Sequence, residues 1–348
     1  MRVRTERVTS ISRKTLMSRF DRTLTRLSAP SPTGRGAHSQ TSTRPELNRY
    51  LSVLVIENAT LSLQILPEAG GGIASFDWHG RTEPIPLMRP FELPPKSQHH
   101  EIDPNQLACY PLLPWSNRIT EGGFDIDGRW IALPLNREEE PWPIHGSGWQ
   151  RAWQVQSHTP HEIQLSLRES SAEAYCYEAT LHYVLHDDAL QVDLAVTNTG
   201  TAAMPFGLGL HPYFPRHGEV SLLAPASHVW INDGQSPIPV DRVAVPPSWD
   251  FRNERALPNG GVDNAFYAWN GEAVIHWSAL QLGLRIKAEA DAFVLYTPAD
   301  KDFFCFEPVD HPINAVHLPG GAAANGMTIL LPQATLRRRF VFSLLESL

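Results

Sequence analysis

The chain has 348 residues, of which 42% are hydrophobic and 19% are charged. These proportions are normal for a globular protein with a buried core, and they exclude a disordered or fibrous chain. The net charge of −8 argues against nucleic acid as a partner, and no apolar run approaches the roughly 18 residues that a membrane span needs.

The first 46 residues differ in composition from the rest. They hold ten basic side chains against three acidic ones, a charge of +7. Because the whole chain has a net charge of −8, residues 47–348 have a net charge of −8 − 7 = −15. Residues 1–46 are rich in Arg, Ser and Thr and lack apolar periodicity, which predicts a disordered basic leader or extension. An organellar transit peptide has this composition, and a non-native upstream translation start gives the same pattern. We expect residues 47–348 to form one domain.

Short β-prone runs separated by turn residues begin at Tyr50. Strands are expected, in chain order, at residues 51–56, 61–66, 72–78, 153–155, 163–167, 220–223, 228–231, 273–277, 282–288, 293–296, 303–307, 328–331 and 335–342. Hairpins are expected over residues 124–135, around Asp127-Gly128, and over residues 175–196, around Asp187-Asp188. There is no convincing helix and no fixed repeat. The pattern predicts an all-β fold, an antiparallel sandwich or barrel.

Residues 205–214 read Pro-Phe-Gly-Leu-Gly-Leu-His-Pro-Tyr-Phe. In one extended strand, Gly207, Gly209 and His211 share a face opposite the apolar side chains. Glycine inside a strand is often found where a ligand or another backbone approaches closely, and Pro212 keeps His211 extended. The stretch therefore indicates an open strand face that ends in a functional histidine. A tight sheet contact with a structural histidine is the alternative.

Residues 303–312 read Phe-Phe-Cys-Phe-Glu-Pro-Val-Asp-His-Pro. Strand alternation places Glu307 on the same face as Phe303 and Cys305. Such neighbours remove water from a carboxylate, which raises its pKa and its basicity. Pro308 follows Glu307 directly, so the backbone is held extended there as well. We predict a functional carboxylate, with a salt-bridged glutamate at a strand end as the alternative.

Three further stretches carry side chains suited to sugar hydroxyls. Asn117 and Arg118 follow a Pro- and Trp-rich loop and offer several N–H donors, although a turn Asn and a surface Arg have the same pattern. His145 lies between tryptophans and glycines, where it either contacts a sugar or fixes the loop. Asp263 either accepts two hydroxyls or caps a turn.

Common metal, nucleotide and nucleophile motifs are absent from the sequence. The 15 histidines form no His-x-His or His-Glu-x-x-His motif, and the three cysteines form no Cys-x-x-Cys. Gly-x-Gly-x-x-Gly and Gly-x-Ser-x-Gly are absent too. We therefore expect no metal. Three widely spaced cysteines in apolar sequence favour reduced, buried thiols, and we expect a cytoplasmic protein.

Taken together and in this order, the five stretches resemble motifs of the aldose 1-epimerase family, the galactose mutarotases, over about residues 51–342. The resemblance implies a large antiparallel β-sandwich with an open sugar cleft, no cofactor, and interconversion of the α and β anomers of a free aldose. It further implies that Glu307 is the general base and His211 the general acid. The implied sugar-orienting ligands are Asn117, Arg118, His145 and Asp263.

Mutarotation needs a base that takes the proton of the C1 hydroxyl and an acid that protonates the ring oxygen. Glutamate and histidine suit these tasks near neutral pH. Under this interpretation Gly207 and Gly209 leave room for the sugar. The aromatic side chains expected to stack on it are Trp115, Trp149 or Tyr213.

Two alternatives stay open. A mutarotase of sugar phosphates would need added cationic side chains near Arg118, and the acidic body argues against it. A non-catalytic sugar-binding β-sandwich would need hydroxyl ligands but no acid and base pair. In either case we expect a small-molecule sugar as the partner and a monomer or a homodimer.

Overall fold

The computed structural model describes residues 51–346, apart from 81, 96–101 and 171–173. Residues 1–46, for which a disordered leader is predicted, lie outside the described residues. In the described part of the chain, no helix has the length and apolar character needed to cross a membrane. The helical segments within these described ranges are short: η2 (Pro104–Gln106), η3 (Thr120–Gly122), η4 (Gly148–Gln150), η5 (Pro247–Trp249), η6 (Ser278–Leu280) and α1 (Gly321–Ala324).

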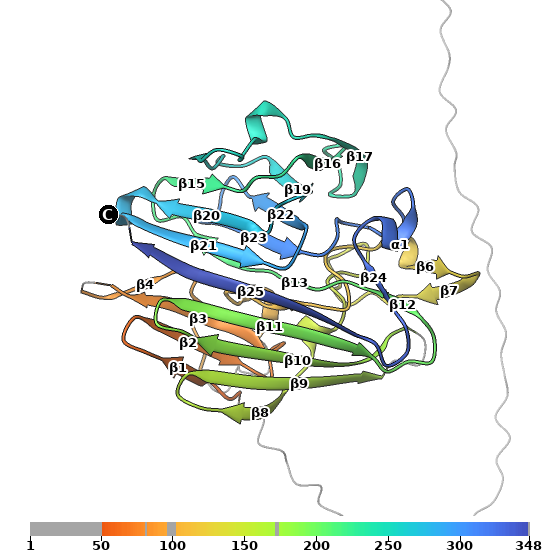
Figure 1. Ribbon diagram of the computed structural model, residues 1–348, viewed down its shortest axis with the longest axis horizontal. Helices are drawn as coiled ribbons and strands as arrows, with labels where there is room; N and C mark the ends of the chain where they lie inside the picture. Colours follow the sequence, from red (N-terminus) through yellow and green to blue (C-terminus); the bar gives the residue numbers. More distant parts are fainter. Residues whose placement is uncertain (1–50, 81, 96–101, 171–173, 347–348) are drawn as a thin grey trace, which may run out of the picture. The chain divides into compact units, whose positions relative to one another are not determined.

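The largest sheet has nine antiparallel strands, and Figure 1 shows most of them side by side, facing the viewer. From edge to edge the strands are β18 (Arg255–Ala256), β15 (Val220–Leu223), β20 (Glu272–Trp277), β21 (Leu282–Ala288), β25 (Thr335–Glu346), β11 (Ala189–Asn198), β10 (Cys176–Leu185), β9 (Glu162–Ser170) and β8 (Gln154–His158). β10 and β11 form the hairpin predicted over residues 175–196, with Tyr183 opposite Val192.

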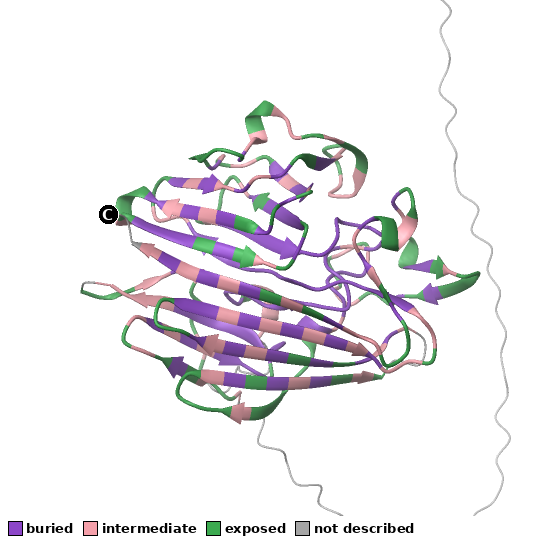
Figure 2. Ribbon diagram, viewed as in Figure 1, coloured by how far each residue is buried: buried purple, intermediate pink, exposed green. Residues whose placement is uncertain are grey.

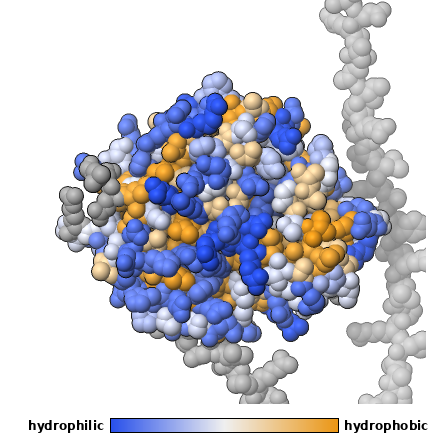
Figure 3. All heavy atoms as spheres, in the orientation of Figure 1, coloured by the Kyte–Doolittle hydropathy of each residue, from blue (hydrophilic) through white to orange (hydrophobic). Residues whose placement is uncertain are grey.

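The nine-stranded sheet has one apolar and one polar face. Burial alternates along β9, β10 and β11, as Figure 2 shows. Leu181 and Phe340 are fully buried on the inner face. The outer face is largely hydrophilic in Figure 3 and carries ion pairs such as that of Arg339 with Asp193. A sheet of this kind packs its apolar face on a second layer.

The second layer consists of an eight-stranded and a four-stranded sheet. The eight-stranded sheet contains β17 (Pro239–Ala244), β16 (His228–Asn232), β19 (Val262–Tyr267), β22 (Ala292–Thr297), β23 (Phe303–Val309), β13 (Gly209–Leu210) and β5 (Pro111–Leu112), with β14 (Tyr213–Pro215) also paired to β23. The four-stranded sheet contains β1 (Leu54–Glu57), β2 (Leu61–Leu66), β3 (Gly72–His79) and β4 (Pro84–Pro86). Two ribbons complete the fold: β12 (Met204–Phe206) with β24 (Thr328–Leu330), and β6 (Gly123–Ile126) with β7 (Arg129–Ala132).

One hydrophobic core joins these sheets. It includes Leu181 from the nine-stranded sheet, Phe76 from the four-stranded sheet, and Phe293 and Phe306 from the eight-stranded sheet. The rings of Phe293 and Phe306 stack with their centroids 4.4 Å apart. Burying each such side chain stabilises the fold by about 1.5–3 kcal/mol. The structure confirms the predicted all-β, antiparallel sandwich.

Local differences from the prediction lie near the functional stretches. Residues 205–214 do not form one strand: β12 pairs with β24 in a separate ribbon, whereas β13 pairs with β5 and β23, and β14 pairs with another part of β23. Residues 262–267, which are not among the expected strands, form strand β19, so Asp263 lies within a strand and caps no turn. The hairpin at Asp127-Gly128 is confirmed, with φ of 52° and 75°. No disulfide joins the three cysteines, although Cys176 is only half-buried.

Candidate active site

The polar residues of the eight-stranded sheet gather on its outer face, opposite the main core. On β23, Phe304 and Phe306 enter the core, whereas Cys305 and Glu307 point to the other face. This is the predicted alternation. On β19, the neighbouring Asp263 lies opposite Tyr296 of β22 in register. Adjacent strands therefore place carboxyl groups and a phenol on one surface.

Loops over this surface enclose a cavity of about 300 Å³, at the lower end of the range for small-molecule sites. Its lining is mostly polar and includes all six residues predicted for the site: Asn117, Arg118, His145, His211, Asp263 and Glu307. A larger cavity of about 740 Å³ lies beside Trp78 and His79 and contains none of them. The choice of site therefore rests on its chemistry and not on its size.

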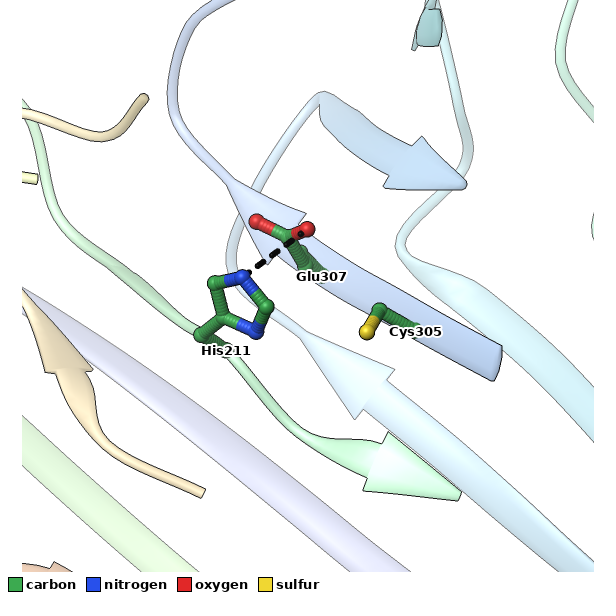
Figure 4. A group of neighbouring side chains, drawn as sticks. All are labelled: His211, Cys305 and Glu307. Atoms are coloured by element: carbon green, nitrogen blue, oxygen red, sulfur yellow. Dashed lines mark ion pairs between the residues drawn. The ribbon is translucent and has the colours of Figure 1, made fainter. Parts of the chain in front are cut away.

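His211 and Glu307 form a close buried pair. Nε2 of His211 lies 3.4 Å from Oε1 of Glu307 (Figure 4), and the two residues are 8% and 2% exposed. The imidazole ring also packs on Tyr110 and Tyr213, with centroid distances of 4.7 Å to each. Among the described residues, Nδ1 of His211 and Oε2 of Glu307 have no hydrogen-bond partner. These two buried polar atoms are thus available to form hydrogen bonds with a ligand.

Burial shifts the protonation of this pair towards the neutral forms. Loss of water, followed by the charge of Arg89, lowers the pKa of His211 to about 3. Loss of water also raises the pKa of Glu307 well above its usual range, and Asp263 adds to this while Arg118 opposes it. In the protein without a bound sugar, the two side chains therefore share one transferable proton, and this proton lies on the Glu307 carboxyl.

His145 and Asn117 hold each other in place by reciprocal hydrogen bonds. The backbone N–H of Asn117 donates to Nδ1 of His145 over 2.9 Å, and the backbone N–H of His145 donates to the carbonyl oxygen of Asn117 over 2.9 Å. Both residues have left-handed backbones, with φ of 56° and 61°, a strain often found at functional sites. Burial lowers the pKa of His145 well below its usual range. The neutral ring therefore carries its proton on Nε2, as a donor.

Arg118 is held in place by Glu140, a carboxylate that the sequence analysis did not predict as its partner. Its Nε and Nη2 donate to the two carboxyl oxygens of Glu140 over 2.7 Å each, and its Nη1 donates to Oδ1 of Asn117 over 3.2 Å. Three of its five N–H groups are used, so two can donate to a ligand. Glu140 lies at the end of a charged loop, and no sequence pattern indicates which arginine it meets.

Gly207 and Gly209 are not part of the cavity, which corrects the role predicted for them. A Cβ atom on Gly207 would lie 2.2 Å from the ring of His311, and one on Gly209 would lie 2.7 Å from Val309. These glycines admit protein groups and leave no space for a sugar. The tight sheet contact, given above as the alternative, is correct for Gly209, which pairs with Val309 of β23, whereas Gly207 lies between β12 and β13 and contacts a side chain.

Asp310 and His311 tie the site segments together just after Glu307. Oδ2 of Asp310 accepts the backbone N–H of Leu208, three residues before His211, over 2.9 Å. Nε2 of His311 accepts the backbone N–H of Ser116 over 3.1 Å. Both residues are buried. The strand that carries Glu307 is thereby joined to the segments that carry His211 and Asn117.

The aromatic predictions are partly correct. Trp149 and Tyr213 line the cavity, but Trp115 packs on Tyr175 and lines a different hollow. Sequence reasoning missed Tyr296, which lies on the cavity wall with 37% of its surface exposed. It also missed Asn105, whose Oδ1 accepts the hydroxyls of two tyrosines, one of them Tyr213 over 2.7 Å. Strand alternation at residues 292–297 would have placed Tyr296 on the polar face.

His211, Cys305 and Glu307 have donor atoms that lie within 4.8 Å of one another (Figure 4). Three such side chains are possible metal ligands, and their spacing in the sequence gave no indication of it. Burial raises the pKa of the Cys305 thiol well above its usual range, as it does for Glu307. A cation would have to displace both protons. The surroundings of this group therefore favour proton transfer over metal binding.

The fold and the cavity define an antiparallel β-sandwich with a buried acid–base pair in a small polar pocket. The aldose 1-epimerase family model matches residues 52–343. The chain is 32% identical over 280 residues to the uncharacterized protein YphB of Escherichia coli (strain K12), which covers 78% of this chain and 92% of that protein. The chain therefore belongs to the aldose 1-epimerase family.

Solved structures show the same fold. A candidate aldose 1-epimerase from Escherichia coli K12 has a TM-score of 0.75 at 28% identity, over 85% of this chain and 99% of that one. A galactose 1-epimerase from Lactobacillus acidophilus NCFM has a TM-score of 0.69 at 18% identity, over 86% and 95% of the two chains. The second likeness concerns the fold alone.

Proposed function

We propose that this protein is an aldose 1-epimerase that interconverts the α and β anomers of a free aldose. The observation that supports this most directly is the buried pair of His211 and Glu307, 3.4 Å apart in a polar cavity. The C1 hydroxyl and the ring oxygen of a pyranose are bonded to the same carbon. An acid and a base that act on both must therefore lie close together.

In the proposed reaction, Glu307 takes the proton of the C1 hydroxyl while the imidazolium of His211 protonates the ring oxygen. The bond between C1 and the ring oxygen breaks, and C1 becomes an aldehyde. Rotation about the C1–C2 bond presents the other carbonyl face. Reclosure returns both protons, so that the enzyme is unchanged and the anomer is inverted.

These roles require the shared proton to lie on His211 when the sugar reacts. Before a sugar binds, burial keeps this proton on Glu307. Its transfer to His211 across the 3.4 Å contact gives the reactive carboxylate and imidazolium. A sugar hydroxyl that donates to Oε2 of Glu307 favours the carboxylate, because hydrogen bonds to a charged form stabilise it. Substrate binding itself thus favours the reactive form.

The remaining predicted residues orient the sugar. Arg118 has two N–H groups left for hydroxyl oxygens, and His145 offers its Nε2–H. The carboxyl of Asp263 has no hydrogen bond within the described residues and accepts from sugar hydroxyls. Burial raises the pKa of Asp263, which Arg118 opposes.

Polarimetry of freshly dissolved α-aldoses tests this proposal. The wild-type protein should accelerate mutarotation, and the acceleration should persist in a chelator because only protons move. Glu307→Gln and His211→Gln should each lower kcat by about 10²–10⁴-fold, the usual contribution of a positioned acid or base. Sugar binding, followed by tryptophan fluorescence, should be largely kept.

The matched control is Glu254→Gln. Glu254 also lies beside a histidine, His276 at 2.8 Å, but this pair is exposed on the nine-stranded sheet. Its loss should leave the rate unchanged. Normal turnover by Glu307→Gln would refute the base assignment. Sugar binding by a wild-type protein that accelerates no aldose would instead support a non-catalytic sugar-binding protein.

A further inference from the structure

Both cationic side chains of the cavity are already paired with carboxylates. Arg118 makes its two-pronged contact with Glu140, and the partners are only 20% and 18% exposed. Arg137 lies 3.3 Å from Asp103 and 3.2 Å from Glu139. Neither arginine therefore presents an uncompensated positive charge to a ligand.

Two carboxyl groups of the cavity have no arginine or lysine partner among the described residues. They belong to Asp263 and Glu307. The His211–Glu307 pair shares one proton and is neutral overall, so the charged groups of the lining are three carboxylates, Asp263, Glu139 and Glu140, against the guanidinium groups of Arg118 and Arg137. A neutral hydroxyl meets donors and acceptors there, whereas a phosphate or carboxylate meets an excess of like charge.

We propose that Glu140 determines the charge specificity of the site, so that the enzyme accepts uncharged aldoses and rejects aldose phosphates and uronates. This rests on the proposed epimerase function. Glu140 cancels the charge of Arg118 but leaves two of its N–H groups for hydroxyl oxygens. Juxtaposed like charges are an effective means of excluding the wrong partner.

The two glutamates that precede Glu140 are not placed to exclude anionic sugars. Glu139 is 76% exposed and touches Arg137 at one atom only, so solvent screens it. Glu138 is exposed and lines no part of the cavity. Of the three consecutive glutamates, Glu140 alone contacts Arg118 among the described residues. Specificity is therefore assigned to one side chain of the loop.

Polarimetry with glucose, glucose 6-phosphate and glucuronate, corrected for spontaneous mutarotation, tests the proposal. In the wild type, kcat/KM for both anions should be at least about 100-fold below that for glucose. Glu140→Gln keeps an acceptor for Arg118 but removes the charge. In this variant the ratio of kcat/KM for glucose to kcat/KM for the anions should fall by at least about tenfold, mainly because KM for the anions decreases.

Two variants separate charge from position. Glu140→Asp keeps the charge on a shorter side chain, and Glu138→Gln makes the same charge change outside the cavity. Both should keep the wild-type ratio within about threefold. Equal turnover of glucose and its anionic derivatives by the wild type, or an unchanged ratio in Glu140→Gln, would overturn the assignment.

Binding measured by calorimetry gives a readout that needs no turnover. The wild type should bind glucose and not glucose 6-phosphate, and Glu140→Gln should gain affinity for the phosphate ester. If the wild type accelerates no aldose, the epimerase function fails. Even then, calorimetry supports the charge specificity if it shows this preference, and refutes it if Glu140→Gln gains no affinity for the ester.

Discussion

At the scale of single residues, three buried histidines show how hydrogen-bond partners set the chemistry of one residue type. Nδ1 of His145 accepts a backbone N–H, which leaves Nε2–H as a donor. His311 accepts a backbone N–H at Nε2 and lies beside the carbonyl oxygen of Pro312, so its ring is fully used. His211 contacts a buried carboxyl instead. Of the three, only His211 is placed to exchange a proton with a second acid–base group.

The protonation of this pair predicts an unusual pH profile. Between about pH 5 and about pH 8, kcat/KM should be flat, because the pair keeps its one proton throughout. In acid the pair loses activity when His211 takes up a proton while Glu307 keeps its own, near the His211 pKa of about 3. Activity falls in alkali when the single proton leaves, above the raised pKa of Glu307.

Initial rates by polarimetry, corrected for spontaneous mutarotation at each pH, give this profile. An acid limb with a midpoint near 6.5, the ordinary value for histidine, would show that His211 titrates as an exposed group and would contradict the buried pair. The Glu254→Gln variant should have the wild-type profile.

At the scale of elements, the connection between β12 and β13 is fitted against the segment that follows β23. The ring of His311 occupies the space beside Gly207, and its Nε2 accepts the N–H of Ser116, next to Asn117. Glycine is required here by the close approach of a side chain. The geometry of three site segments therefore depends on one contact that involves no cavity residue.

Gly207→Ala should lower the free energy of unfolding by about 1–3 kcal/mol, the usual cost of overpacking. It should also lower kcat several-fold, because displacement of His311 moves the loop that carries Asn117. Urea unfolding and polarimetry measure the two effects.

The control is the double-mutant cycle with His311→Ala. Removing the ring removes the clash, so adding Gly207→Ala in that background should cost less than about 0.5 kcal/mol. A cost equal to that in the wild type would show that His311 is not the neighbour that requires glycine.

At the scale of the whole molecule, Asp310 joins the two layers of the sandwich. Its Oδ1 accepts from Nε of Arg338 over 2.6 Å, and Arg338 belongs to β25 in the nine-stranded sheet. Its Oδ2 accepts from Leu208. The carboxyl is almost fully buried, while Arg338 is 24% exposed. One side chain therefore connects the far sheet to the segment that carries His211.

Asp310→Asn should lower the free energy of unfolding by about 1–3 kcal/mol, less than for a fully buried pair because water reaches Arg338. Asp193→Asn, which breaks the exposed pair with Arg339, should cost less than about 1 kcal/mol. Equal costs in urea unfolding would show that Asp310 makes no special connection between the layers.

The sequence alone predicted the strands wherever hydrophobic residues alternate with polar ones. It predicted the faces of Cys305 and Glu307, the hairpin of β10 and β11, and the turn at Asp127-Gly128. It failed at residues 205–214, because the division into β12, β13 and β14 depends on which neighbours each segment meets. Period-2 patterning reports which face a residue occupies and not the partner strand.

The sequence by itself thus determined the all-β class and identified six of the polar residues that line the cavity. The tertiary structure decided how they are used. It placed His211 beside Glu307, 96 positions apart in the sequence, and paired Arg118 with Glu140. It also filled the space beside Gly207 with the ring of His311. The physical reason is that strand periodicity is local, whereas burial, pKa shifts and ion pairing depend on neighbours that only the packed sheets bring together.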